Sequence, residues 1–294
     1  MPQHSIFHAA LMDLHSKSRQ YSEPRSFREY ALASGHAEAK TAPSISVDSL
    51  DALSPDLRRA NSMVFRLGSP TGERHTRFGL ATALHGWGDY FLLDERVFKG
   101  VTPTPYTPDV PAELLYAFTL LPAYTETSAV NLAIASALAA HALEIDPASI
   151  PSAPATGQTT NSFEVRPHAE LKATWRHDKG QVEIDALFVG QRNRQETLFV
   201  LEAKCSPQFS SLAKHKLVYP ILALRDHLPP RMGICPVYMR VIKRRNDLIF
   251  YFAECKPLSR ESPQQCINEL QVAKCSAYSL EIDLKRTKRR TARG

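Results

Sequence analysis

The clearest alternation of apolar and polar residues lies in the second half of the chain. Between residues 163 and 204 the pattern predicts three strands, FEVRPHAELKATWR, QVEIDALFVG and ETLFVLEAK, with turns at HDKG and QRNRQ. A helix, SSLAKHKLVYPILALRDHL, follows them. Two further strands, PVYMRVIKRR and DLIFYFAEC, resemble a hairpin that turns at residues 245–247. This order predicts an α/β (α+β) fold in which a mixed β-sheet is flanked by helices.

The first hundred residues have a different pattern. Residues 1–60 are polar and favour short helices, with one at the N-terminus, one that ends at Gly35 and two in DSLDALSPDLRRA. SMVFRLG and HTRFGLATAL alternate around the turn SPTGE, which predicts a β-hairpin, and the strand DYFLLDE follows. We therefore expect an N-terminal α+β accessory domain over residues 1–105.

Two proline-rich stretches divide the rest of the chain. TPTPYTPDVP at 102–111 indicates a domain boundary, and IDPASIPSAPATGQTT at 145–160 predicts an exposed, mobile loop. Between them, AELLYAFTLLPAY and TETSAVNLAIASALAAHALE predict helices, the second capped by Thr or Ser. We expect a second domain over residues 106–260 and a basic C-terminal extension over 261–294.

Composition and charge narrow the class of protein. The chain has 294 residues, 43% hydrophobic and 22% charged, which excludes a largely disordered or fibrous protein. Residues 204–294 hold 18 Lys/Arg against 7 Asp/Glu, whereas residues 1–203 hold 18 against 23. The basic third favours a polyanionic partner such as nucleic acid, although LKRTKRRTARG at its end is equally typical of a solvated tail.

The lengths of the apolar runs and the positions of Cys and His residues bear on cellular location and on metal binding. Apolar runs stay short of the ~20 residues that span a bilayer, so we expect no membrane partner and a cytoplasmic protein. The five cysteines form no CxxC pair, which argues against a zinc site, and their odd number favours reduced thiols. His85 is interpreted as a turn residue, and His168 and His177 flank a strand without ligand spacing.

Charged residues gather near the ends of two neighbouring predicted strands. Because residues two apart share a face of a strand, Glu183 and Asp185 point one way, and Glu202 and Lys204 do the same on the next strand. In an antiparallel hairpin Asp185 lies beside Glu202. Such carboxylates raise each other's pKa unless a cation neutralises them, and Mg²⁺ would do so while activating water and stabilising phosphoryl charge. The alternative is an ordinary salt-bridged strand pair, Asp185 or Glu202 with Lys204 or Lys172.

This constellation resembles the PD-(D/E)XK nuclease superfamily, which includes restriction endonucleases and many repair nucleases. The resemblance covers roughly residues 115–255. Asp185 matches the first acid and Glu202-Ala203-Lys204 matches (D/E)XK, while Ile184 stands where the family has proline. The resemblance implies a restriction-endonuclease-like sheet, with Asp185, Glu202 and the carbonyl of Ala203 as ligands of Mg²⁺ (or Mn²⁺) and Lys204 as the catalytic lysine.

The resemblance also implies a further catalytic acid on a preceding helix. Glu126 is the candidate and Glu170 is the rival, and Glu126 is equally well explained as a first-turn residue facing the helix dipole. Basic and aromatic residues after the motif are the candidates for nucleic-acid contacts, with solvated surface as their alternative. They are Lys214, Lys216, Tyr219, Lys243, Arg244 and Arg245.

These observations together predict a Mg²⁺-dependent endonuclease that hydrolyses DNA phosphodiester bonds, of a restriction or defence type. A homodimer is one assembly that would cut both strands of a duplex. The alternative is a non-catalytic nucleic-acid-binding protein or subunit that retains the nuclease fold.

Overall fold

A mixed seven-stranded sheet forms the centre of the protein. The computed structural model describes residues 5–146, 149, 153–244, 247–257 and 266–281. The strand order is β5-β12-β11-β10-β8-β7-β6. β8 pairs parallel with β10 and β12 pairs parallel with β5, while the other neighbours are antiparallel. The strands are β5 (Thr104–Tyr106), β6 (Ala155–Val165), β7 (Trp175–Arg192), β8 (Gln195–Cys205), β10 (Gly233–Arg244), β11 (Asp247–Cys255) and β12 (Val272–Glu281).

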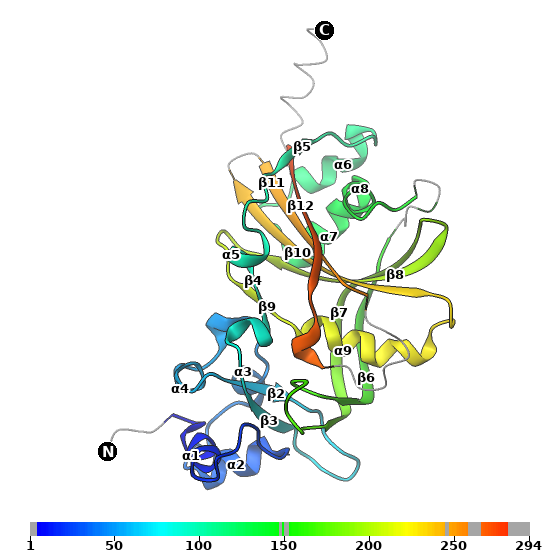
Figure 1. Cartoon of the computed structure of the whole chain (residues 1–294). Helices are drawn as coiled ribbons and strands as arrows, with labels where there is room; N and C mark the ends of the chain where they lie inside the picture. Colours follow the sequence, from blue (N-terminus) through cyan, green and yellow to red (C-terminus); the bar gives the residue numbers. More distant parts are fainter. Residues whose placement is uncertain (1–4, 147–148, 150–152, 245–246, 258–265, 282–294) are drawn as a thin grey trace.

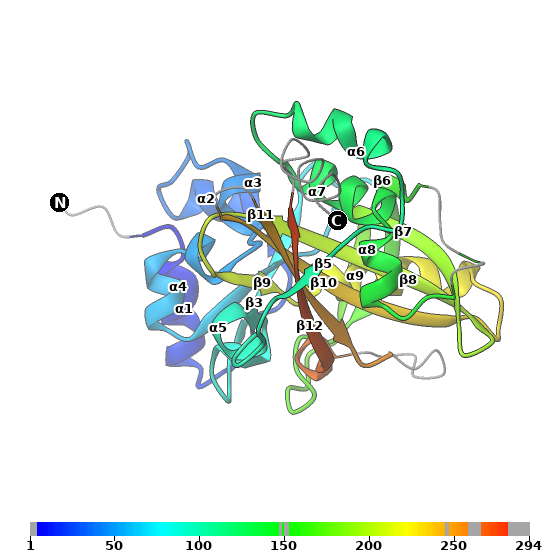
Figure 2. The ribbon, with the colours of Figure 1, turned by 90° about the horizontal axis from the view of Figure 1, so that it is seen from above.

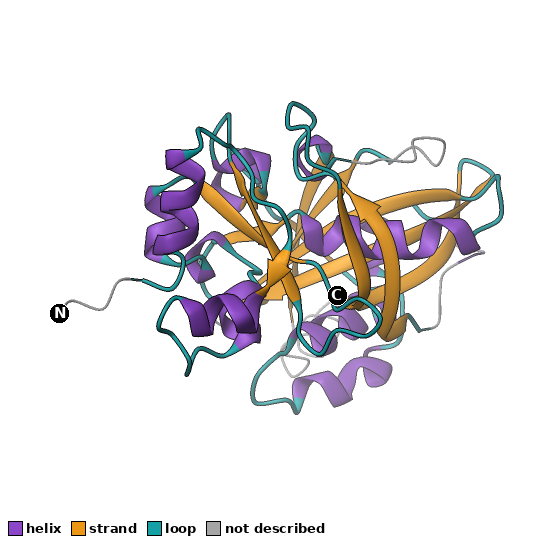
Figure 3. Cartoon of the chain, turned by 90° about the horizontal axis from the view of Figure 1, so that it is seen from below, coloured by secondary structure: helices purple, strands orange, loops and turns teal. Residues whose placement is uncertain are grey.

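Helices cover both faces of this sheet, as predicted (Figure 2, Figure 3). α7 (Glu126–Ala135) and α8 (Leu138–Ala142) bury one face, where Leu201 and Ala203 of β8 join their core. α9 (His215–Leu224) packs on the opposite face, where Val200 meets Ile221. The alternation of β8 therefore directs Glu202 toward the α9 face. α6 (Ala112–Thr119) lies beside α7, and the 3-10 turn η4 (Arg225–His227) follows α9.

The N-terminal residues form the predicted helices and hairpin at one end of the sheet (blue in Figure 1). A three-stranded sheet has the order β1-β3-β2. The elements are α1 (His8–Ser16), β1 (Arg25–Ser26), α2 (Phe27–Ala33), α3 (Thr41–Ile45), η1 (Leu50–Ala52), α4 (Pro55–Arg59), β2 (Ser62–Arg66), β3 (Arg77–Thr82), η2 (Trp87–Asp89), β4 (Phe91–Leu93) and α5 (Asp94–Val97).

This N-terminal unit shares its core with the central sheet. Phe65 of β2 contacts Trp175 of β7, with ring centroids 5.6 Å apart, and one cluster of buried residues runs across both parts. β4 pairs with β9 (Ser211–Ala213), which immediately precedes α9. The boundary expected at residue 105 therefore crosses a continuous core, and residues 1–105 are not packed as a separate domain.

Three predicted connections are corrected by the structure. β6 begins at Ala155, so the exposed loop expected at 145–160 overlaps a strand, and residues 147–148 and 150–152 lie outside the described residues. HDKG lies inside β7 and does not form a turn. The pairing of β7 with β6 continues past it through a local irregularity, at which Lys179 adopts φ +44°. The helix expected from Ser210 begins at His215, because Ser211–Ala213 pair with β4.

The C-terminal region is also part of the sheet. The extension expected at 261–294 contains η5 (Ile267–Glu269) and β12, whose Leu280 is buried between β11 and β5. Residues 258–265 and 282–294 lie outside the described residues. The five cysteines are free thiols, as predicted. Within the described residues, none of the helices has the length and hydropathy needed to cross a bilayer.

Candidate active site

The antiparallel pairing of β7 with β8, predicted from the sequence, brings the two motif acids together. Ala186 lies opposite Leu201, and continuing this register places Asp185 opposite Glu202. The backbone N–H of Ala203 donates a hydrogen bond to Asp185 Oδ2 at 2.9 Å. This bond orients the Asp185 carboxylate beside the (D/E)XK segment.

Glu202 is almost completely buried, with 2% of its surface exposed. Burial raises the pKa of Glu202 to about 8, and the charge of Asp185 adds to this effect. Two ammonium groups oppose it: the Nζ atoms of Lys216 and Lys204 lie 3.5 and 3.6 Å from Glu202 Oε1. Even with two cations this close, the ionised carboxylate is poorly stabilised.

Lys204 connects β8 to α7 and to the N-terminal unit. Its Nζ lies 3.2 Å from Glu126 Oε1 and 4.0 Å from Asp48 Oδ2. Although burial opposes the charged form, the carboxylates of Glu202, Glu126 and Asp48 raise the pKa of Lys204 above its usual value. Lys204 is therefore held as an ammonium ion.

Of the two rival acids, the structure brings Glu126 to the cluster. Glu126 is the first residue of α7, and Thr125 caps this helix in a capping box with Ser128. Glu170 instead pairs with His85, whose Nε2 lies 2.6 Å from Glu170 Oε1, on an exposed surface.

Lys216 completes the cluster from the first turn of α9. Its Nζ lies 3.0 Å from Glu183 Oε2 and 3.7 Å from Asp48 Oδ1. The carboxylates of Glu202, Asp48 and Glu183 raise the pKa of Lys216 against the effect of burial.

Asp48 is a member of the cluster that sequence reasoning missed. The backbone N–H of Ala213 donates a hydrogen bond to the carbonyl of Asp48 at 2.8 Å, and this bond ties the loop of Asp48 to β9. Such a contact between distant parts of the chain has no local sequence signal.

The cluster carries more negative than positive charge. Five carboxyl groups, those of Asp48, Glu126, Glu183, Asp185 and Glu202, face two ammonium groups, those of Lys204 and Lys216. The formal balance is −3 when all of them are ionised. A bound divalent cation would offset this excess, and carboxylate oxygens are donors that Mg²⁺ prefers. The donor set therefore fits the predicted ion.

Two of the predicted nucleic-acid contacts, Lys214 and Tyr219, are buried in the folded chain. Lys214 is buried, its Nζ donates to the carbonyl of Asn268 at 3.0 Å, and burial lowers its pKa to about 8. Tyr219 is buried too, and its hydroxyl donates to the carbonyl of Arg66 at 3.4 Å. Helical periodicity did not reveal this, because α9 is covered both by the sheet and by the N-terminal unit.

Of the remaining predicted contacts, Lys216 belongs to the cluster and the others lie at the end of β10. Lys243 and Arg244 are exposed, and Lys243 Nζ lies 6.0 Å from the centre of the Tyr124 ring. Arg245 lies outside the described residues. Lys243 and Arg244 are thus accessible to a partner, and their role as nucleic-acid contacts stays a prediction.

Comparison with known proteins gives a family without a stated activity. Residues 99–279 match the family model described as a domain of unknown function, DUF6997. The chain belongs to the DUF6997 family. The DUF6997 region includes Glu126, Asp185, Glu202, Lys204 and Lys216, whereas Asp48 precedes it. No curated protein and no solved structure matches the chain.

A second group of potential metal ligands lies apart from the motif residues. Among the described residues His85, His168 and Glu170 bring ligand atoms within 4.8 Å of one another. The Nδ1 atom of His168 accepts a hydrogen bond from Glu170 N–H at 3.1 Å, so the neutral ring carries its proton on Nε2, which faces Asp89 Oδ2 at 3.4 Å. In this arrangement His168 has no free lone pair for a metal.

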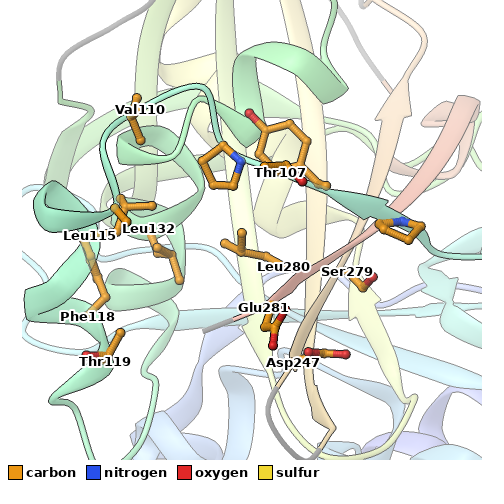
Figure 4. A pocket seen from close by; sticks show the side chains of 14 residues that line it. Thr107, Val110, Leu115, Phe118, Thr119, Leu132, Asp247, Ser279, Leu280 and Glu281 are labelled. Carbon is orange, nitrogen blue, oxygen red and sulfur yellow. The ribbon is translucent and has the colours of Figure 1, made fainter. Parts of the chain in front are cut away.

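Two cavities differ in their relation to the cluster. A cavity of about 390 Å³ adjoins it, because Asp48, Glu183 and Lys216 belong to its wall. Another, of about 320 Å³, lies between α6, β5 and β12 (Figure 4). Apolar side chains such as Leu115 and Leu280 line this second cavity, and it contains none of the predicted site residues.

Proposed function

We propose that this DUF6997 protein is a metal-dependent endonuclease that hydrolyses DNA phosphodiester bonds in a restriction or defence role. The observation that carries the proposal is the buried Glu202, set beside Asp185 and Lys204 in a cluster whose formal charge is −3 when every group is ionised. A carboxylate this poorly stabilised at the junction of two strands is costly unless a cation binds it. The resemblance to PD-(D/E)XK nucleases supports the same assignment, including a restriction-endonuclease-like sheet.

The metal-binding residues in this proposal are Asp185 and Glu202, with the carbonyl of Ala203 as a backbone ligand. When bound, Mg²⁺ or Mn²⁺ supplies a Lewis acid that stabilises charge on a phosphoryl oxygen and lowers the pKa of water. The Ala203 N–H holds the Asp185 carboxylate in place for this role. At neutral pH burial keeps Glu202 largely protonated, and a cation that offsets the burial would ionise it.

In this proposal Lys204 supplies a positive charge from the protein to the phosphate, in addition to that of the metal ion. Glu126 and Glu202 hold its ammonium group within 3.6 Å, which fixes the position of this charge in the cluster. There it donates a hydrogen bond to a phosphate oxygen and stabilises the charge that grows as water adds to phosphorus. Glu126 is a positioning residue for Lys204 in this scheme.

The charge of the cluster should weaken DNA binding when no cation is bound. A site with a formal balance of −3 repels a phosphodiester backbone, and neutralising it removes that repulsion. Exposed Lys243 and Arg244 are the proposed contacts to the backbone outside the cluster. A homodimer would present two such sites to the two strands of a duplex.

The test is nicking of supercoiled plasmid with Mg²⁺, with Mn²⁺ and with EDTA. The wild-type protein should nick only with metal, and Glu202→Ala and Lys204→Ala should lose at least about 100-fold in rate. Matched controls are Glu196→Ala, an exposed acid on β8, and Lys172→Ala, an exposed lysine outside the cluster. Both should cut like the wild type.

Two results would overturn the proposal. Metal-dependent binding of DNA without cleavage of any substrate would leave a non-catalytic nucleic-acid-binding protein. Equal nicking by the wild type and by Glu202→Ala would show that the cluster is not the active site.

A further inference from the structure

The 390 Å³ cavity beside the catalytic cluster is formed by three parts of the chain. Residues of the N-terminal unit, including Ser46 and Arg66, line one side. Gln181 of β7 and the first turns of α9 line the others. The cavity and the cluster share Lys216, whose Nζ lies 3.5 Å from Glu202 Oε1, so a group bound in the cavity would lie next to the proposed scissile phosphate.

Arg66 brings an incompletely paired guanidinium group to this wall. It is the last residue of β2, and its Nη1 donates to Ser46 Oγ at 3.3 Å. Its Nε is buried without a hydrogen-bond partner, and within the described residues the guanidinium group forms no ion pair. A buried donor without an acceptor costs free energy, and the planar fork of arginine matches the oxygens of a phosphate.

The start of α9 provides a second, independent feature. His215 is 8% exposed, and its Nδ1 has no hydrogen-bond partner among the described residues. α9 has ten residues and no side-chain cap at its N-terminus. His215 and Lys216 of its first turn line the cavity, so the positive end of the helix dipole lies at this wall, which favours an anion.

Two acids also line the cavity, but both are paired. Glu183 and Asp48 lie 3.0 and 3.7 Å from Lys216 Nζ. Arg66 is thus the cation of this wall that has no carboxylate partner in the described part of the chain. An anion that entered the cavity would meet this cation and the helix end.

We infer that this cavity binds a phosphate group of the substrate and that Arg66 is its main ligand. The identification of this phosphate as part of a DNA substrate rests on the proposed endonuclease function. The phosphate has two possible sources, an internal phosphodiester next to the scissile bond or a phosphorylated strand end. In either case Arg66 fixes the position of the strand relative to Glu202 and Lys204 and does not itself touch the reacting atoms.

Binding of fluorescein-labelled short single-stranded DNA, followed by anisotropy in EDTA, tests this inference. Arg66→Gln should weaken binding about 10- to 100-fold, as expected for the loss of charge-assisted hydrogen bonds. Arg66→Lys should lose less, because it keeps the charge, and its binding should show the same salt dependence as the wild type. Arg59→Gln, an exposed arginine of α4, is the matched control and should bind like the wild type.

The choice of DNA separates the two sources of phosphate. Tighter binding of 5′-phosphorylated than of 5′-hydroxyl DNA, lost in Arg66→Gln, identifies a strand end. Equal binding of linear and circular single strands, with the same loss in Arg66→Gln, identifies an internal phosphate. Because Arg66→Gln can also disturb folding, inorganic phosphate is used as a second probe. It should raise the melting temperature of the wild type and of Arg59→Gln, but not that of Arg66→Gln.

Plasmid nicking by the same preparations distinguishes failure of this inference from failure of the proposed function. If the wild type nicks DNA and Arg66→Gln binds DNA and inorganic phosphate like the wild type, the phosphate site is refuted and the endonuclease stands. If the wild type does not nick but Arg66→Gln still loses phosphate binding, the endonuclease is refuted and the phosphate site stands.

Discussion

Replacing Glu202 by glutamine should stabilise the metal-free protein at neutral pH. Burial raises the pKa of this carboxyl to about 8 from its ordinary value of 4.5. Between these two pH values the folded chain keeps a proton that the unfolded chain has lost, so stability falls as pH rises through the window. Each pH unit lowers the free energy of unfolding by about 1.4 kcal/mol, which amounts to about 3 kcal/mol at pH 7 and about 5 kcal/mol above pH 8.

Glutamine carries no titrating proton and removes this loss. Urea unfolding in EDTA at about pH 5, 7 and 8.5 measures this pH-dependent loss of stability. The free energy of unfolding is taken from the midpoint and the slope of each curve. The advantage of Glu202→Gln over the wild type should be small at pH 5 and largest at pH 8.5. Glu196→Gln, an exposed change on the same strand, should leave the pH dependence of the wild type unaltered.

Adding Mg²⁺ extends the same experiment. A cation that binds the ionised Glu202 stabilises only the folded state, so the wild type should gain stability at pH 8.5 while Glu202→Gln gains far less. A constant difference between Glu202→Gln and the wild type at all three pH values would refute the reasoning, as would a less stable Glu202→Gln at pH 7.

Three further predictions concern other parts of the fold. Gly68→Ala should destabilise the protein by about 4 kcal/mol or more in urea unfolding, because Gly68 has φ +75° and a Cβ would meet the Asp178 carbonyl at 2.1 Å; a wild-type midpoint would contradict this. Arg240→Met should cost about 3–5 kcal/mol, since the buried Asp94 carboxylate, 3.3 Å from Arg240 Nε, loses its cationic partner and keeps only the hydrogen bonds from Tyr238 and Ser210. Adding Asp94→Leu should recover part of that loss, and a double variant less stable than Arg240→Met would argue against it. Tyr219→Phe should cost about 1 kcal/mol or less and leave DNA affinity unchanged in anisotropy, whereas a tenfold loss of affinity would restore Tyr219 as a nucleic-acid contact.

The local pattern of apolar and polar residues was sufficient to predict the two strands that carry the motif. The two-residue period placed Glu202 and Asp185 on one face, and the short turn between the strands fixed the antiparallel register that sets them opposite each other. The cap of α7 at Thr125 was equally readable, and it brought Glu126 to the cluster. These features depend on residues close together in the chain, except for the last contact between Glu126 and Lys204.

Features that depend on distant pairing were not predictable. Asp48 reaches the cluster because its loop bonds to Ala213, more than 160 residues away in the sequence. Lys214 resembles a surface lysine, yet its Nζ is covered by the carbonyl of Asn268 near the other end of the chain. β12 lies in the segment expected as a basic C-terminal extension, and its pairing with β11 and β5 defines it as a strand.

The pairing of β4 with β9 affects how this protein can be divided or grafted. A fragment cut to the family match would begin at residue 99 and keep Glu202 and Lys204, but it would lose Asp48 and Arg66. It would also leave β9 with an open edge directly before α9, the helix that presents Lys216. Chimeras that exchange the DUF6997 region should therefore carry the first hundred residues with it. Sequence searches limited to this region will not include Asp48, one acid of the cluster.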